Sequence, residues 1–156
     1  MYEMKTLDTE DAQKVIAAVI AYREQMKHRG IAVVVVDKYG DVIAGLRTTG
    51  MHGRYFKAAQ RKAYSAAVME RDTSALMDFW NQQQSEGMRG PSDWNDVMLT
   101  SLHGGLCIQF GKEIVGGIGC AGGSGGDPNN PLSDWAFAEA GLRGLGEGFT
   151  RGARGR

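Results

Sequence analysis

Residues 31–47 read IAVVVVDKYGDVIAGLR, and this stretch decides the fold class. Five of the six residues from 31 to 36 are β-branched, and because such side chains favour strands, the run predicts a buried strand. A short turn with Gly40 follows, and residues 41–47 predict a second strand. Two strands joined by a short turn that contains glycine form an antiparallel hairpin.

The rest of the chain repeats this pairing of strands. Residues 106–110 and 113–118 bracket a second short turn and predict a second hairpin. Apolar residues at helical spacing and capping residues predict helices over residues 9–28, 54–71, from Thr73 onward, and 133–145. The order indicates an α+β protein with an antiparallel sheet built from two hairpins, its flanking helices on one face or at its ends.

Composition excludes several functional classes. The 156 residues carry 18 basic and 18 acidic side chains, so the zero net charge argues against binding to nucleic acid or a membrane surface. No apolar run approaches the roughly 20 residues that span a bilayer. Two cysteines make no disulfide framework, and no secretory leader is apparent, so we expect a cytoplasmic protein. We expect one domain over residues 1–150 and a flexible basic tail over residues 151–156.

Glycines from 117 to 122 spell G-x-G-x-x-G directly after a predicted strand. One interpretation is a dinucleotide site with a pyrophosphate at a helix N-terminus. The other is a strand packed tightly against a neighbour, followed by a pocket-lining loop that includes Gly122 and Gly123. The second is favoured, because a glycine-rich loop follows the motif where a helix would have to begin.

Lys62 lies on the apparently inward stripe of the second predicted helix, which also carries Tyr55 and Ala59. A buried ammonium group needs a partner, so Lys62 either binds an anionic ligand, pairs with a carboxylate, or extends its amine to the edge of the stripe. Arg47 ends the second strand, where it suits bidentate carboxylate binding or a surface ion pair.

Three histidines offer proton-transfer or haem-ligating groups. His28 lies at a helix C-terminus, where a cation is favoured electrostatically. His52 lies in the loop after Arg47, and His103 precedes Gly104 at the start of the second hairpin. Both loop histidines are candidates for general base or axial ligand, the alternative being solvated loop residues. No other metal site is predicted, since neither zinc-ligand spacing nor C-x-x-C-H occurs.

Several segments match one family in order along nearly the whole chain. They are VVVVD at 33–37 with Arg47, AA at 58–59 with Lys62, GGL at 104–106, VGGIG at 115–119, and Asp134 with AGL at 140–142. Together they resemble the GlcG/HbpS-like family, which includes the C-terminal domain of PduO-type cobalamin adenosyltransferases. The resemblance implies a profilin-like α+β fold, a homo-oligomer, and haem or tetrapyrrole binding in some members, many of them encoded in catabolic operons.

The sequence departs from the family pattern at the expected pocket, which favours a specialised site. Thr49 stands where the family usually has an acidic residue, and Cys107 where proline is common. One hypothesis is haem binding or handling, with His52, His103 or His28 as axial ligand. A second is a cofactor-independent lyase, hydratase or isomerase acting on a small anionic catabolite.

In the enzyme hypothesis, His52 and Lys62 are the predicted catalytic residues, and Arg47 and Lys62 hold a carboxylate. The predicted ligand-binding set is Arg47, Tyr55, His103, Gly104, Gly105, Gly122 and Gly123. A third hypothesis is a non-catalytic assembly or regulatory subunit.

Overall fold

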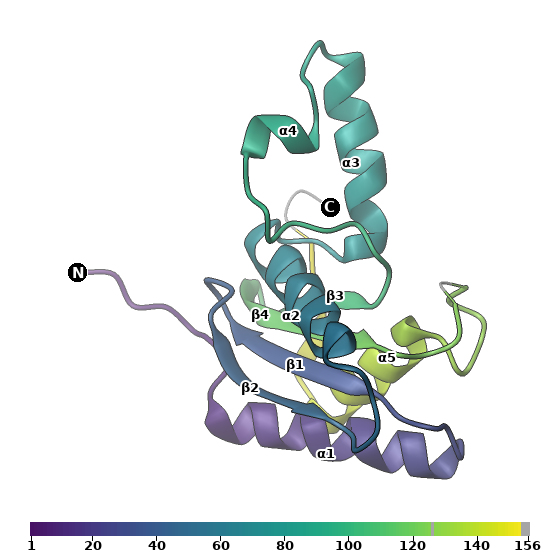
Figure 1. Ribbon diagram of the computed structural model, residues 1–156. Coiled ribbons are helices and arrows are strands. Elements are labelled where there is room, and N and C mark those ends of the chain that lie inside the picture. The colour runs from purple at the N-terminus through teal and green to yellow at the C-terminus, as the bar shows by residue number, and fades with distance from the viewer. Residues whose placement is uncertain (126, 154–156) are drawn as a thin grey trace.

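The computed structural model describes residues 1–125 and 127–153 of the chain. The elements, in order, are α1 (Thr9–Gln25), β1 (Ala32–Asp37), β2 (Val42–Arg47), α2 (Gly53–Val68), α3 (Thr73–Ser85), α4 (Pro91–Trp94), β3 (Gly105–Phe110), β4 (Glu113–Ala121), α5 (Asp134–Leu145) and β5 (Phe149–Arg151) (Figure 1). The predicted α+β class is confirmed. In this part of the chain, no helix is both long enough and apolar enough to cross a membrane.

The strands form one antiparallel sheet in the order β2-β1-β4-β3-β5. Both predicted hairpins are present, as β1–β2 and β3–β4. Antiparallel pairing of β1 with β4 joins them into one sheet, with Val34 opposite Gly119. Strand β5 was not predicted. It pairs Arg151 with Ile108, so the first residue of the expected tail lies in a strand. Residues 154–156 of that expected tail lie outside the described residues.

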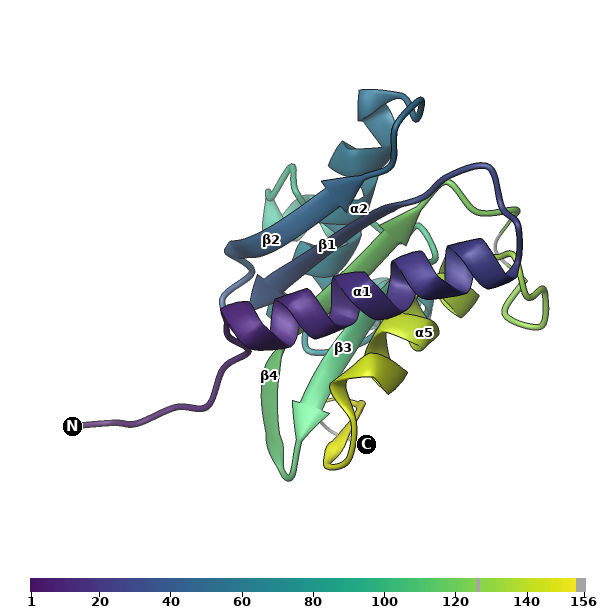
Figure 2. The same cartoon turned by 90° about the horizontal axis from the view of Figure 1, so that it is seen from below.

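Helices cover both faces of the sheet, so the expectation of helices on one face or at its ends is wrong. Helices α1 and α5 lie on one face and α2 lies on the other (Figure 2). Strand β1 needs helices on both faces of the sheet, because its residues Ala32 to Val36 are all fully buried. Val33 and Val35 pack in the cluster that contains α1 and α5, whereas Ala32, Val34 and Val36 pack against alanines of α2.

Glycines on β3 and β4 let α2 approach the sheet closely. A Cβ atom on Gly117 or Gly119 would overlap the backbone carbonyl oxygen of Ala63 or Ala59, respectively. A Cβ atom on Gly105 would overlap the carbonyl oxygen of Lys62 in the same way. The glycines of the G-x-G-x-x-G stretch therefore let β4 pack closely against α2. This agrees with the favoured interpretation, a strand packed tightly against a neighbour.

Helices α3 and α4 project away from the sheet (Figure 1). The chain then returns along α2, where Tyr64 Oη lies 2.6 Å from Asp96 Oδ2 and Thr100 N donates to Ser65 Oγ at 2.8 Å. These two bonds bring residues 101–103 beside α2. Residues 96–103, here called the return segment, supply one wall of the cavity described below.

Candidate functional site

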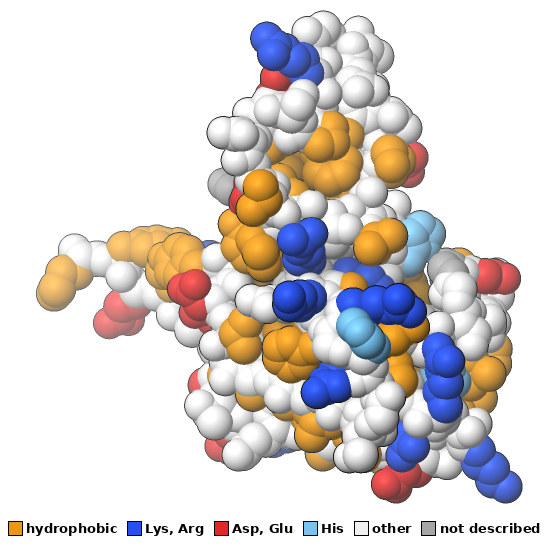
Figure 3. Space-filling view, viewed as in Figure 1, with side chains coloured by type: hydrophobic (Ala, Val, Ile, Leu, Met, Phe, Trp, Pro, Cys, Tyr) orange, Lys and Arg blue, Asp and Glu red, His pale blue; other side chains and the backbone are white. Residues whose placement is uncertain are grey.

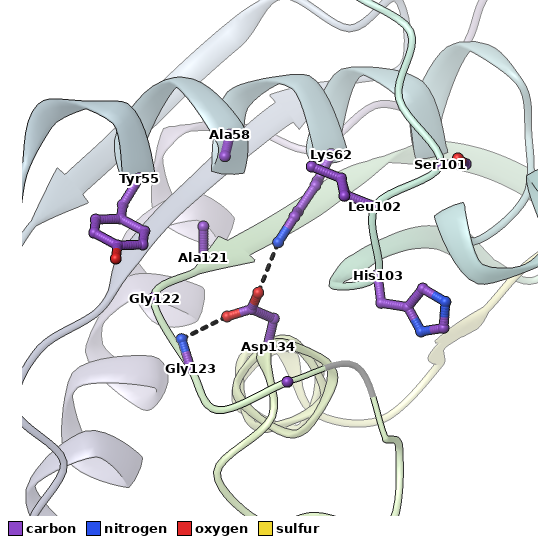
Figure 4. Close-up of a pocket in the computed structure, with 11 residues that line it drawn as sticks. Tyr55, Ala58, Lys62, Ser101, Leu102, His103, Ala121, Gly122, Gly123 and Asp134 are labelled. Atoms are coloured by element: carbon purple, nitrogen blue, oxygen red, sulfur yellow. Dashed lines mark hydrogen bonds and ion pairs between the residues drawn. The ribbon is translucent and has the colours of Figure 1, made fainter.

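A cavity of about 410 Å³ lies beside α2, within the range typical of small-ligand sites. Its walls come from α2, the return segment, the loop after β4 and the start of α5 (Figure 4). Most of the lining surface is apolar. The lining residues are Tyr55, Ala58, Lys62, Ser101, Leu102, His103, Ala121, Gly122, Gly123, Gly125 and Asp134.

A buried ion pair forms one wall of the cavity. Lys62 Nζ donates to Asp134 Oδ2 at 2.7 Å and to the carbonyl oxygen of Cys120 at 2.9 Å, and only 5% of the Lys62 side chain is exposed. The other oxygen of the carboxylate, Asp134 Oδ1, accepts the backbone N–H of Gly123 at 2.7 Å. Of the three interpretations of Lys62, the pairing with a carboxylate is the one that the structure shows.

Asp134 was missing from the predicted site, although it belongs to the family pattern. Ser133 caps α5 by accepting the N–H of Ala136 at 3.1 Å, and this cap places Asp134 at the first helical position, facing the cavity. The buried position of Lys62 was the available signal for a carboxylate partner. Nothing in the local sequence indicates which carboxylate it is.

Tyr55 and His103 lie on opposite sides of the ion pair (Figure 4). Arg54 Nη2 donates to Tyr55 Oη at 3.2 Å. This hydrogen bond, followed by the charge of the Arg54 guanidinium, lowers the pKa of the Tyr55 phenol below its ordinary value. The cavity is therefore bordered by His103 on one side and by a phenol of lowered pKa on the other.

Of the three histidines, all within the described residues, His103 is the one that lines this cavity. His52 is exposed and caps α2, its Nδ1 accepting the N–H of Arg54 at 3.1 Å. His28 is half-buried, with Nδ1 2.8 Å from the carbonyl oxygen of Gly30 and its ring against the edge of Phe137. The structure thus separates the three predicted axial-ligand candidates.

Arg47 does not join Lys62. Its guanidinium donates to the carbonyl oxygen of Met51, and its side chain lines a different hollow together with Arg23 and Thr48. In the enzyme hypothesis, Arg47 and Lys62 bind the same carboxylate. In this structure the two side chains line different hollows, so they do not form a common binding site.

Two of the four glycines of the predicted site line the cavity and two lie behind it. Gly122 and Gly123 form part of the lining. A Cβ atom on Gly104 would lie 2.6 Å from Asp134 Cβ, and Gly104 has a φ of +111°, which L side chains rarely adopt. Gly104 and Gly105 thus let the chain pass closely behind the ion pair.

The lining residues fit a haem or related tetrapyrrole chemically. Ala58, Leu102 and Ala121 offer apolar contact to a flat ring, and His103 offers an imidazole nitrogen, a common haem ligand. In the described part of the chain, no group of three or more His, Cys, Asp or Glu side chains could hold a metal ion without such a cofactor.

The fold and the cavity define a small α+β protein with a helix-covered antiparallel sheet and a ligand-sized cavity beside one helix. The chain belongs to the family described as "Haem degrading protein HbpS-like", whose model matches residues 7–142.

Solved structures share this fold. HbpS is 29% identical with a TM-score of 0.77, covering 94% of each chain. PduOC, solved as a haem complex, is 21% identical with a TM-score of 0.73, covering 89% of this chain and 94% of its own. Protein ORFY of Klebsiella pneumoniae is 19% identical with a TM-score of 0.75, covering 93% of this chain and 94% of its own. At these lower identities, the last two show the fold alone. A search of the curated proteins found no match.

Proposed function

We propose that this protein binds haem or a closely related tetrapyrrole in the cavity beside α2, with His103 as the axial ligand. The observation that carries the proposal is the position of His103 in the wall of a mostly apolar cavity of about 410 Å³. Membership of the HbpS-like family and the haem complex of PduOC support the same ligand class.

The hydrogen bond of His52 argues against its serving as the axial ligand. A neutral imidazole has one nitrogen lone pair, and in His52 the Nδ1 lone pair accepts the N–H of Arg54. Binding a metal through Nε2 would move the proton to Nδ1 and break this helix cap. Because His103 lines the cavity and His52 lies outside its lining, His103 is the better candidate.

An absorbance titration with hemin tests the proposal. We expect saturable binding of one hemin per chain by the wild-type protein, and a shifted Soret band with weakened binding in His103→Ala. His52→Ala and His28→Ala are matched controls that remove an imidazole outside the cavity and should keep the wild-type spectrum. Circular dichroism confirms that each variant is folded. A wild-type titration that does not saturate would overturn haem binding, whereas a spectral change in His52→Ala alone would overturn the ligand assignment.

A second candidate function is proton transfer on a small organic acid, and the buried ion pair favours it. Paired ionisable groups in the wall of a cleft are common in catalytic sites, and Lys62, Asp134 and Tyr55 all line this cavity. His52, the predicted proton carrier, lies outside the cavity lining, so Tyr55 takes that role here. Incubation of small keto acids with the protein in D₂O tests this function. NMR should show deuterium next to the carbonyl group with the wild-type protein and none with Tyr55→Phe.

We also expect a homo-oligomer, as the family resemblance implies, and a location in the cytoplasm, because the two cysteines make no disulfide framework. Light scattering on the purified protein measures its mass against the 16.9 kDa of one chain. A mass equal to that of one chain would contradict the oligomer.

A further inference from the structure

A second hollow of about 290 Å³ adjoins the cavity and shares Ala58 and Leu102 with its lining. Its other lining residues are Thr100 from the return segment and three basic residues of α2, namely Arg54, Lys57 and Arg61. Figure 3 shows that basic side chains gather over α2 on this face of the molecule. We call this hollow the basic hollow.

The three basic residues repel one another. They are spaced three and four residues apart, so they share one face of α2, where like charges destabilise a helix. Arg54 also lies in the first turn of the helix, where the positive end of the helix dipole disfavours cations. Two unfavourable electrostatic terms therefore act on the same short row of side chains.

No carboxylate in the described residues offsets this repulsion. Helix α2 contains no acidic residue, and none of the three side chains forms an ion pair with a carboxylate there. Arg54 donates to the Tyr55 phenol, whereas Lys57 and Arg61 have no hydrogen-bond or ion-pair partner in that part of the chain. An unpaired basic row that lines a hollow is the arrangement expected for binding an anion.

We propose that the basic hollow is a carboxylate-binding subsite, and that it selects ligands of the neighbouring cavity that carry at least two acidic groups. For a tetrapyrrole ligand, this inference rests on the proposed function. Guanidinium groups bind carboxylates through two parallel hydrogen bonds, and an ammonium group adds a point charge. The Thr100 hydroxyl accepts the N–H of Leu102 at 3.2 Å and keeps its own hydrogen for donation to the ligand.

Two sources could supply such carboxylates, namely the acidic side groups of haem or a separate small polyacid. Three probes separate them: hemin, hemin dimethyl ester, in which both carboxylates are blocked, and citrate. Hemin and its ester are titrated by absorbance, and citrate by calorimetry. The test variant is Lys57→Gln/Arg61→Gln, which leaves the Tyr55 contact of Arg54 intact. The control is Lys14→Gln/Lys112→Gln, which removes two exposed charges from α1 and the β3–β4 turn.

We expect the wild-type protein to bind hemin at least about tenfold more tightly than the ester, since charge-assisted hydrogen bonds are the stronger kind. The test variant should lose this preference, while the control variant should keep it. Raising the salt concentration should weaken the binding of hemin more than that of the ester, because the three basic residues are exposed and their charges are screened.

The outcomes distinguish this inference from the proposed function. Equal affinity of the wild-type protein for hemin and ester would overturn the subsite and leave haem binding in place. A second outcome is that the wild-type protein binds citrate but not hemin, and that the test variant no longer binds citrate. In that case haem binding is wrong and the carboxylate subsite is supported. If the test variant matches the control with every probe, the subsite is wrong.

Discussion

Lys62 Nζ lies 2.7 Å from Asp134 Oδ2, although the two residues are 72 positions apart in the sequence. The contact joins α2 to the first residue of α5, and through Asp134 Oδ1 it also holds the N–H of Gly123. A single ion pair thus connects three of the segments that surround the candidate cavity. Its removal should affect stability and cavity shape together.

Replacing one member of this pair should destabilise the protein. In Asp134→Ala the buried Lys62 ammonium loses its charge partner, and we expect the free energy of unfolding to fall by about 3 kcal/mol. The double variant Lys62→Met/Asp134→Ala should recover part of that loss, because no unpaired charge remains buried. Urea unfolding followed by circular dichroism measures both changes. Arg89→Ala, which breaks an exposed ion pair with Asp93, is the control and should cost less than about 0.5 kcal/mol.

The close packing of α2 against the sheet can be tested at Gly119. A Cβ atom there would overlap the backbone carbonyl oxygen of Ala59, and backbone cannot rotate away as a side chain can. Gly119→Ala should therefore lower the free energy of unfolding by about 3 kcal/mol. Gly53→Ala is the matched control, since its Cβ atom would meet nothing within 4 Å and alanine favours a helix. Equal stability of the two variants in urea would contradict the tight contact.

Strand β5 should depend on Arg151. Its Nε and Nη2 atoms donate to Asp72 Oδ2, and the Asp72 side chain is 1% exposed. Arg151→Met leaves this carboxylate buried, and among the described residues only the N–H of Cys107 still donates to it, so we expect a loss of about 3 kcal/mol. Lys5→Met, which removes an exposed pair with Glu113, is the comparison and should change stability little. A similarly small effect of Arg151→Met in thermal or urea unfolding would mean that β5 is not anchored by this pair.

The contact between Tyr64 and Asp96 should make stability fall at alkaline pH. The hydrogen bond to Asp96, together with burial, raises the pKa of Tyr64 from 10.0 to about 12. The folded state therefore holds the phenol proton more tightly than the unfolded state. The stabilisation is fully present below pH 10 and is lost as the pH rises from 10 to about 12.

Urea unfolding between pH 9 and pH 11.5 measures this loss. Tyr64→Phe lacks the phenol and should show a smaller decrease over that interval. Tyr39→Phe, which removes an exposed phenol from the β1–β2 turn, should behave like the wild-type protein. If Tyr64→Phe and the wild-type protein lose stability in parallel, the folded and unfolded states share one pKa at Tyr64.

Local patterns were sufficient to predict most elements of the fold. The β-branched run of β1 and the turn at Gly40 predicted the first hairpin, and apolar spacing predicted the helices that became α1, α2 and α5. Strand β5 was not predicted, because it is only three residues long (FTR) and has no hydrophobic run of its own. Its position depends on pairing with β3 and on the bond to Asp72, both of which are distant in sequence.

The candidate site was predictable only in part. The inward stripe of α2 indicated Tyr55 and Lys62, and the glycine-rich loop indicated Gly122 and Gly123, all of which line the cavity. His52 and Arg47 looked equally suitable, because a sequence shows which loop carries a side chain but not the direction in which it points. In the structure, His52 caps α2 and Arg47 lines another hollow.

The sequence by itself determined the hairpins, the main helices and the need of Lys62 for an anionic partner, because these follow from short-range periodicity and from the cost of burying a charge. Only the tertiary structure decided that the partner is Asp134, that His103 is the histidine in the cavity wall, and that helices cover both faces of the sheet. The reason is physical: each of these depends on contacts between residues far apart in the chain, and such contacts exist only once the sheet has assembled.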